Sequence, residues 1–263
     1  MLNEATSYPR FACLSAFWLK LIALGCMVCD HIGYLGLSGL WWLRLIGRMA
    51  FPIYAFLLVE GFYNTRSRAR YALRLLSFAL LSELPFNLLS TGGFSLRHSE
   101  GQNVMFELLL GLLLLMALEE INLRWFKPWQ NSRKPERYDN FAVALLLASA
   151  AVAAACYLAD LLELDYHSYG IMLVAAMYLF RGCLPLVAAG QAAVFMFIMP
   201  RVRRTIPLFG TYINTYFYGW AVLSMIPIAL YNGKPGVRSR AVQYAFYLAY
   251  PLHMLVLALI ARY

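Results

Sequence analysis

The stretch KLIALGCMVCDHIGY, at residues 20–34, decides the fold class because it places Lys, Asp and His side chains in the apolar body of a membrane-spanning helix. Charged groups inside a bilayer cost at least ~2.5 kcal/mol each, so Lys20, Asp30 and His31 mark a candidate functional site. Lys20 and His31 are eleven residues apart, and eleven steps of ~100° return to within ~20° of the starting direction. Both side chains are therefore predicted to share one helix face, ~16 Å apart along the axis. The alternative is that Lys20 only extends to the membrane surface and His31 only makes a buried contact.

The composition extends this interpretation to the whole chain. The 263 residues are 62% hydrophobic and 13% charged, with a mean hydropathy of +0.63, whereas a soluble domain carries ~25% charged residues. Many apolar runs approach or exceed the ~18–20 residues that cross a bilayer. The predicted spans are 17–36, 45–63, 71–90, 104–121, 141–162, 169–181, 183–200, 209–231 and 241–260. We expect an all-α, polytopic membrane protein in which residues 1–263 form a single bundle of about nine transmembrane helices.

The distribution of charge predicts the orientation of the bundle. The net charge of +9 comes from basic clusters between the apolar runs, which is typical of loops on the cytoplasmic side and excludes nucleic acid as the reason for the charge. Loops 64–70 and 122–140 are basic, whereas ADLLELDYHSYG, at residues 159–170, is acidic and is expected in the periplasm. This predicts an inner-membrane protein with a cytoplasmic N-terminus. RVRR at 201–204 and KPGVRSR at 234–240 flank one predicted span, so either one basic loop lies outside or one segment is re-entrant.

Cysteine usage points away from a disulfide framework or a metal site. The chain has five cysteines, all in or beside apolar runs, and none has the Cys/His spacing of a zinc site. No metal is therefore expected.

The side chain of Asp30 is expected to point in a different direction from that of its neighbour His31. Adjacent helical residues lie ~100° apart and do not face each other, so Asp30 is expected to pair with Arg44 or Arg48 of the next span. A carboxylate from another helix is then the better candidate to orient His31.

Further polar residues predict a cavity inside the bundle. Glu83 lies four residues before Asn87, and Asn103 four residues before Glu107, at similar depth in neighbouring spans. Converging acidic groups within a membrane typically line a path or a site. Glu60 either joins this cavity or only pairs with an arginine of the 64–70 loop, Arg66 or Arg68. In the last span His253, with Tyr247 and Tyr250 shortly before it, is a further candidate member.

Four of these segments resemble the TraX family of conjugal-transfer membrane proteins. They are KLIALGCMVCDHIG, RLIGRMAFPIYAFLLVEGFYNT, RLLSFALLSELPFNLL and the closing YLAYPLHM, and they follow in the same order over nearly the whole chain. The family is known for N-acetylation of the N-terminus of pilin with acetyl-CoA. The basic residue eleven positions before His31 is also similar to the motif of type 3 membrane acyltransferases.

The resemblance implies a role for each candidate residue. His31 would act as general base or as acetyl carrier, and Asp30, Glu83 or Glu107 would orient or balance the charge of the site. Arg48 and Asn103 are the candidate donors to a developing oxyanion. The cofactor-binding residues would be Lys20, Arg48, Arg66, Arg68 and Arg70, and the substrate-binding residues Glu60, Asn103, Tyr250 and His253. The expected partners are acetyl-CoA, an acceptor peptide such as pilin or a glycan or lipid, and membrane lipids.

Two other functions fit parts of the pattern. The buried Glu and His residues could form the relay of a proton-coupled transporter, although the sequence shows no inverted repeat. A structural partner in the assembly of a surface appendage would leave the buried charges unexplained.

Overall fold

A computed structural model describes residues 11–35, 40–91, 101–127, 138–199, 203–208, 211–237 and 239–261. The helices of its first half are α1 (Ala16–Tyr34), α2 (Leu43–Gly47), α3 (Ala50–Asn64), α4 (Arg68–Thr91), α5 (Val104–Ile121) and η1 (Asn122–Phe126). Then follow α7 (Tyr138–Leu161), α8 (His167–Leu179), α9 (Leu184–Ala193), η3 (Val194–Ile198), η4 (Tyr218–Ser224), α10 (Met225–Ala229) and α11 (Arg240–Ile260). A hairpin of β1 (Arg203–Leu208) and β2 (Thr211–Tyr216) interrupts the helices.

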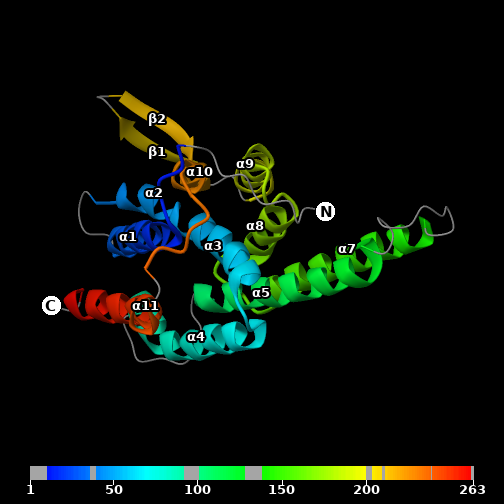
Figure 1. The fold of residues 1–263 in the computed structure, drawn as a ribbon. Coiled ribbons are helices and arrows are strands. Elements are labelled where there is room, and N and C mark those ends of the chain that lie inside the picture. The colour runs from blue at the N-terminus through cyan, green and yellow to red at the C-terminus, as the bar shows by residue number, and fades with distance from the viewer. Residues whose placement is uncertain are drawn as a thin grey trace.

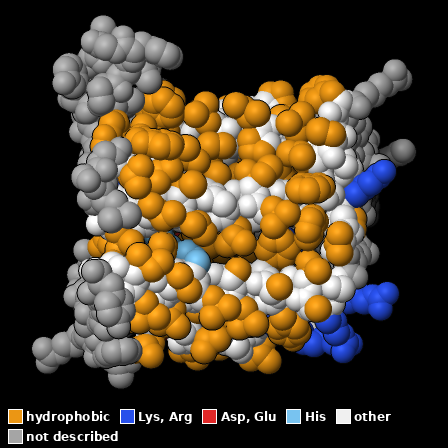
Figure 2. Space-filling view, turned by 90° about the vertical axis from the view of Figure 1, so that its left-hand side faces the viewer, with side chains coloured by type: hydrophobic (Ala, Val, Ile, Leu, Met, Phe, Trp, Pro, Cys, Tyr) orange, Lys and Arg blue, Asp and Glu red, His pale blue; other side chains and the backbone are white. Residues whose placement is uncertain are grey.

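The chain is an all-α polytopic membrane protein apart from this hairpin. Five helical stretches are long and apolar enough to cross a membrane, and three shorter apolar helices accompany them. The long stretches are Ala16–Tyr34, Leu43–Asn64, Arg68–Ser90, Asn140–Leu161 and Arg240–Ile260. Figure 2 shows an almost continuous apolar surface on one face, with Lys and Arg side chains gathered at one edge. This pattern is typical of a surface that faces lipid, with its charges held at the level of the membrane boundary.

Helix α3 forms the centre of the bundle, and α7 lies at its outside. Figure 1 shows α3 between α1, α5 and α8, while α7 runs along the far side of α5. The interior buries 61% of the Leu43–Asn64 span but only 17% of the Asn140–Leu161 span. Both stretches are apolar all round, which is typical of membrane helices, so only packing decides which of them forms the core.

Each of the two ends of the bundle takes its name here from a residue of α1: the Lys20 end and the His31 end. Nine helical segments run between them within the described residues: α1, α2–α3, α4, α5, α7, α8, α9–η3, η4–α10 and α11. Thr65, in the first basic loop, lines a cavity at the Lys20 end, whereas Asp165, in the acidic loop, lines a cavity at the His31 end. The basic and acidic loops thus lie at opposite ends, as predicted, although residues 128–137 of the second basic loop lie outside the described residues.

The predicted span at 209–231 is wrong in its first part. Strand β2 occupies Thr211–Tyr216 and pairs antiparallel with β1, from Arg203 opposite Tyr216 to Leu208 opposite Thr211. The sequence TYINTY is rich in aromatic and β-branched residues, which favour strands but are equally common in apolar spans. The crossing segment is the shorter η4–α10, whose helices cover only ~20 Å.

The hairpin also settles the position of the two last basic segments. Phe217, directly after β2, contacts Arg48 at the His31 end, whereas Tyr231, after α10, lines the cavity at the Lys20 end. The hairpin therefore lies at the His31 end and residues 234–237 at the Lys20 end. The two basic segments therefore lie near opposite ends of α1.

Candidate functional site

Two cavities open along one face of α1. The larger, the Lys20 cavity, has a volume of about 540 Å³ and is lined by Lys20. The smaller, the His31 cavity, has a volume of about 190 Å³ and is lined by His31 and Asp30. Helix α1 therefore presents its intramembrane cation to one cavity and its imidazole to the other, as expected from their eleven-residue spacing.

The Lys20 cavity carries an excess of positive charge. It lies between α1, α3, α4 and α11, and the cations in its lining are Lys20, Arg74 and Arg240. Glu60 also lines it, but Arg181 from the end of α8 binds this carboxylate, with Nε 2.8 Å from Oε1. Because a cation outside the lining neutralises the acid, the three lining cations make this cavity suitable for an anion.

The partner of Glu60 is a correction to the sequence-based prediction. Glu60 forms an ion pair with Arg181, which the prediction did not include. The guanidinium of Arg68 lies 3.9 Å from the centre of the Phe62 ring. Arg181 is 121 residues away in sequence, so spacing alone gave no indication of this contact.

The imidazole of His31 has a partner on the last helix. His31 Nδ1 lies 2.7 Å from His253 Nε2, and His253 Nδ1 lies 2.8 Å from the carbonyl oxygen of Ala249. A carbonyl oxygen can only accept, so His253 Nδ1 carries a proton and His253 Nε2 is an acceptor when that ring is neutral. His31 Nδ1 must then be the donor, which leaves the lone pair on His31 Nε2.

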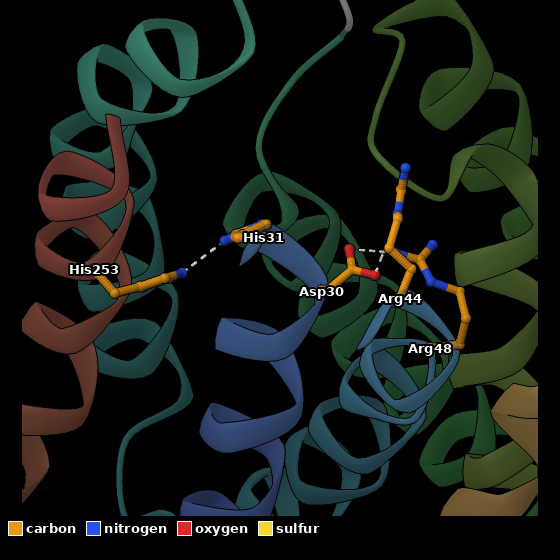
Figure 3. Close-up of polar contacts among 5 residues, drawn as sticks. All are labelled: Asp30, His31, Arg44, Arg48 and His253. Carbon is orange, nitrogen blue, oxygen red and sulfur yellow. Dashed lines mark hydrogen bonds and ion pairs between the residues drawn. The ribbon is translucent and has the colours of Figure 1, made fainter. Parts of the chain in front are cut away.

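The expectation that a carboxylate orients His31 is therefore wrong, because His253 holds this position. Figure 3 shows His253 pointing from α11 toward His31 on α1, while Asp30 points in the other direction. Asp30 is the neighbour of His31 in sequence, and the helical rotation of ~100° per residue separates the two side chains.

Asp30 pairs with arginines, as predicted. Its Oδ2 accepts a hydrogen bond from Arg48 Nη2, and its Oδ1 lies 3.7 Å from Arg44 Nε. A Cβ at position 47 would collide with the Asp30 side chain, so Gly47 allows α2 to approach α1 closely. The rings of Phe217 and Tyr218 cover the Arg48 guanidinium, at 5.2 and 5.7 Å. This network fixes one wall of the His31 cavity.

A second carboxylate reaches the His31 cavity from the acidic loop between α7 and α8. Part of the Asp165 side chain is accessible to solvent, and it lines the cavity near Arg48. Partial removal from water raises the pKa of Asp165 to about 6, although Arg48 acts in the opposite direction. The carboxylate is thus mainly ionised at neutral pH, so the cavity contains two cations and two anions.

The other predicted polar residues join helices rather than line either cavity. Asn103 caps α5 by accepting from the Met105 N–H at 3.1 Å. Its amide donates to Glu83 Oε2 at 2.7 Å and to the Ala79 carbonyl at 2.9 Å. Glu83 also accepts from Asn87 at 3.4 Å, which confirms that these two share a helix face.

Glu107 is completely buried, and it lies against the beginning of α8. A Cβ at position 170 would collide with its carboxyl group, so Gly170 makes room for it. The two cavities described here have neither Glu107 nor Asn103 in their linings.

Several candidate ligand-binding residues lie where the sequence did not place them. Arg66, Arg68 and Arg70 are outside the linings of both cavities, and Arg48 lines the His31 cavity instead of the Lys20 cavity. Arg74 and Arg240 were missed. For Arg74 a signal existed, because it is a cation one turn inside the predicted span 71–90. Its buried Nε atom has no hydrogen-bond partner within the described part of the chain.

Together, fold and site define a multi-pass membrane protein with an intramembrane histidine pair beside two internal cavities. The family described as TraX protein matches residues 15–261. The chain belongs to the TraX family, which confirms the resemblance drawn from its motifs.

A known protein is similar to the chain over almost its full length. The chain is 28% identical over 255 residues to the "Probable fimbrial assembly protein FimC, serogroup H1" of Dichelobacter nodosus. The matched region covers 92% of this chain and 94% of the relative. No solved structure matches the chain significantly.

Proposed function

We propose that this protein is a membrane-embedded acetyltransferase that moves an acetyl group from acetyl-CoA to an acceptor amine or hydroxyl. The observation that carries the proposal is the contact of His31 Nδ1 with His253, which leaves the lone pair on His31 Nε2, in the lining of a small cavity that adjoins a larger, cation-lined one. An imidazole is the usual general base near neutral pH.

Acetyl-CoA would bind in the Lys20 cavity. Its phosphate groups need several cationic partners, and Lys20, Arg74 and Arg240 provide three in one lining. The volume of about 540 Å³ falls within the ~300–1,000 Å³ that is typical of small-molecule sites. The expected contacts of Arg66, Arg68 and Arg70 with the phosphates have no such support.

In the direct route, His31 Nε2 removes a proton from the acceptor as its nitrogen or oxygen attacks the thioester carbon. The C–S bond then breaks, and the CoA thiolate takes up the proton from His31. In a two-step route, His31 Nε2 attacks the thioester carbon, the C–S bond breaks and CoA leaves as a thiolate. The acceptor then attacks the acetyl carbon, the bond to His31 Nε2 breaks, and the proton of the acceptor passes through this nitrogen to the thiolate. In both routes His253 accepts the hydrogen bond from His31 Nδ1 and fixes the ring orientation, so it is a positioning residue.

The tetrahedral intermediate of either route carries a negative oxygen, which needs a donor. Arg48 lines the His31 cavity and is 8% exposed, so a guanidinium there acts in surroundings of low dielectric constant. Asn103, the other candidate, already donates its amide hydrogens to the Ala79 carbonyl and to Glu83. We therefore assign oxyanion stabilisation to Arg48.

The acceptor would reach His31 from the His31 end. The membership of the TraX family and the relative named as a fimbrial assembly protein favour a subunit of a surface appendage, such as pilin, with its N-terminal amine as acceptor. We further propose an inner-membrane location with the Lys20 end in the cytoplasm, where acetyl-CoA is available.

The test uses the full chain purified in detergent. Binding of acetyl-CoA is measured by calorimetry, and acetyl transfer to amine-terminated peptides by mass spectrometry. The wild type should bind acetyl-CoA and acetylate peptides, and His31→Ala should bind but not transfer. His167→Ala is the matched control, because this histidine lies at the start of α8 with 48% of its side chain exposed.

The outcomes separate the competing mechanisms. Retained turnover in His31→Ala contradicts the role of this residue, and absent binding of acetyl-CoA to the wild type favours a transporter. Acetylated His31 after incubation with acetyl-CoA alone indicates the two-step route.

A further inference from the structure

Four side chains belong to the linings of both cavities: Met27, Tyr54, Val104 and Tyr250. They come from α1, α3, α5 and α11, so four helices converge at this point. Three of them are almost inaccessible, with Met27 and Val104 8% and Tyr250 3% exposed. These four side chains, called the shared wall below, separate the Lys20 cavity from the His31 cavity.

The shared wall stands directly before the histidine pair. Met27 lies four residues before His31, so both side chains lie on the same face of α1. On α11 the ring of Tyr250 lies 5.9 Å from that of His253, measured between ring centres. Any group that passes from the Lys20 cavity to His31 Nε2 must therefore displace or pass the shared wall.

A thioester that enters from the Lys20 cavity meets this wall with its acyl end first. The acyl group must then fit into the His31 cavity together with the reacting end of the acceptor. At about 190 Å³ this cavity is smaller than the ~300 Å³ at the lower limit of typical ligand sites. Phe51 and Tyr166, stacked with ring centres 3.9 Å apart, also line it and leave little room for adjustment.

We infer that the shared wall, and Met27 in particular, selects short acyl groups by excluding chains longer than acetyl. Met27 is the member that lies on the same helix and the same face as His31, and its truncation is expected to join space from both cavities. The inference rests on the proposed acetyl transfer and adds a determinant of donor specificity to it.

The experiment compares acetyl-, propionyl- and butyryl-CoA as donors for the full-length protein in detergent. Met27→Ala should raise the ratio of kcat/KM for butyryl-CoA to that for acetyl-CoA at least ~10-fold, since one methylene in an apolar site changes selectivity ~10–200-fold. Val104→Ala removes fewer atoms and should raise the ratio less.

Two variants serve as controls. Met177→Ala removes the same side chain from a buried position in α8, where 2% is exposed and which lies outside both linings. Tyr250→Phe keeps the volume of the shared wall and removes only the hydroxyl. Neither should change the ratio by more than ~2-fold, because neither opens the wall.

An unchanged ratio in Met27→Ala, with acetyl transfer retained, overturns the inference and leaves the proposed function standing. A similar rise in Met177→Ala also overturns it, because the effect would then come from general loosening of the core. Absence of acetyl transfer in the wild type contradicts the proposed function itself, and the inference falls with it.

Discussion

The two cavities use the same types of charged residue in opposite ways. In the Lys20 cavity the lone lining carboxylate, Glu60, is bound by Arg181 from outside the lining, and the lining cations Lys20 and Arg74 lie over the rings of Phe246 and Tyr71. In the His31 cavity Arg48 and Arg44 pair with Asp30, and aromatic rings cover both guanidinium groups. The cations of the first cavity give it an excess of positive charge, whereas in the second cavity Arg48 and Arg44 balance Asp30, and the proposed mechanism gives Arg48 the oxyanion as a further partner. The identity of a residue thus says less about its role than the partner that the fold brings to it.

The largest effect is expected at His31, in the His31 cavity. His31→Ala should lower kcat for acetyl transfer ~10³-fold, within the ~10²–10⁴-fold range of general acid–base catalysis. The Kd of acetyl-CoA should change less than ~2-fold, because the Lys20 cavity supplies the binding energy. Calorimetry and rate measurements on the same preparation check both parts. A parallel loss of binding would mean that the two cavities are not separate in function.

The next effect concerns stability. Arg48→Met leaves Asp30 without its closest partner in a buried site, and breaking such a pair costs ~3–5 kcal/mol of unfolding free energy. Side-chain exposures in this pair are only 10% and 13%.

The matched control is Arg124→Met in η1, directly after α5, where the pair with Glu120 has side-chain exposures of 70% and 55%. Its loss should cost less than ~1 kcal/mol. Thermal unfolding in detergent measures both variants, and equal losses would show that Arg48 does not anchor the wall.

His253 should have an intermediate effect on rate. His253→Ala removes the acceptor of the His31 Nδ1 hydrogen bond, and a bond to a group that becomes charged contributes ~1.5–3 kcal/mol, or ~10–100-fold in kcat. His253→Gln supplies a carbonyl acceptor and should recover part of the rate. KM for acetyl-CoA should not move in either variant. Equal rates in the Ala and Gln variants would contradict a positioning role.

The smallest effect is expected at the Lys20 cavity, because three cations together are proposed to bind the phosphate groups of acetyl-CoA. Arg74→Gln should weaken acetyl-CoA binding ~10-fold, equivalent to ~1.4 kcal/mol, with little change in kcat. Arg66→Gln, outside both linings, should leave Kd unchanged. A stronger effect of Arg66 than of Arg74 would reverse the assignment of the donor site.

The sequence by itself determined the all-α polytopic membrane class and the pairing of Asp30 with the arginines of the next span. These follow from short-range rules: the length of an apolar run, the 3.6-residue helical period and the contact between successive helices. The same rules separated His31 from Asp30 and placed Lys20 on the face of His31.

Only the tertiary structure decided which groups complete the site. His253 lies 222 residues from His31 and Arg181 lies 121 residues from Glu60, and such contacts depend on how helices pack, which no local pattern contains. The strand at Thr211–Tyr216 could not be predicted either, because the residue types that favour strands are also common in membrane spans. The meeting of the two cavities at Met27, Tyr54, Val104 and Tyr250 likewise exists only once four helices have converged.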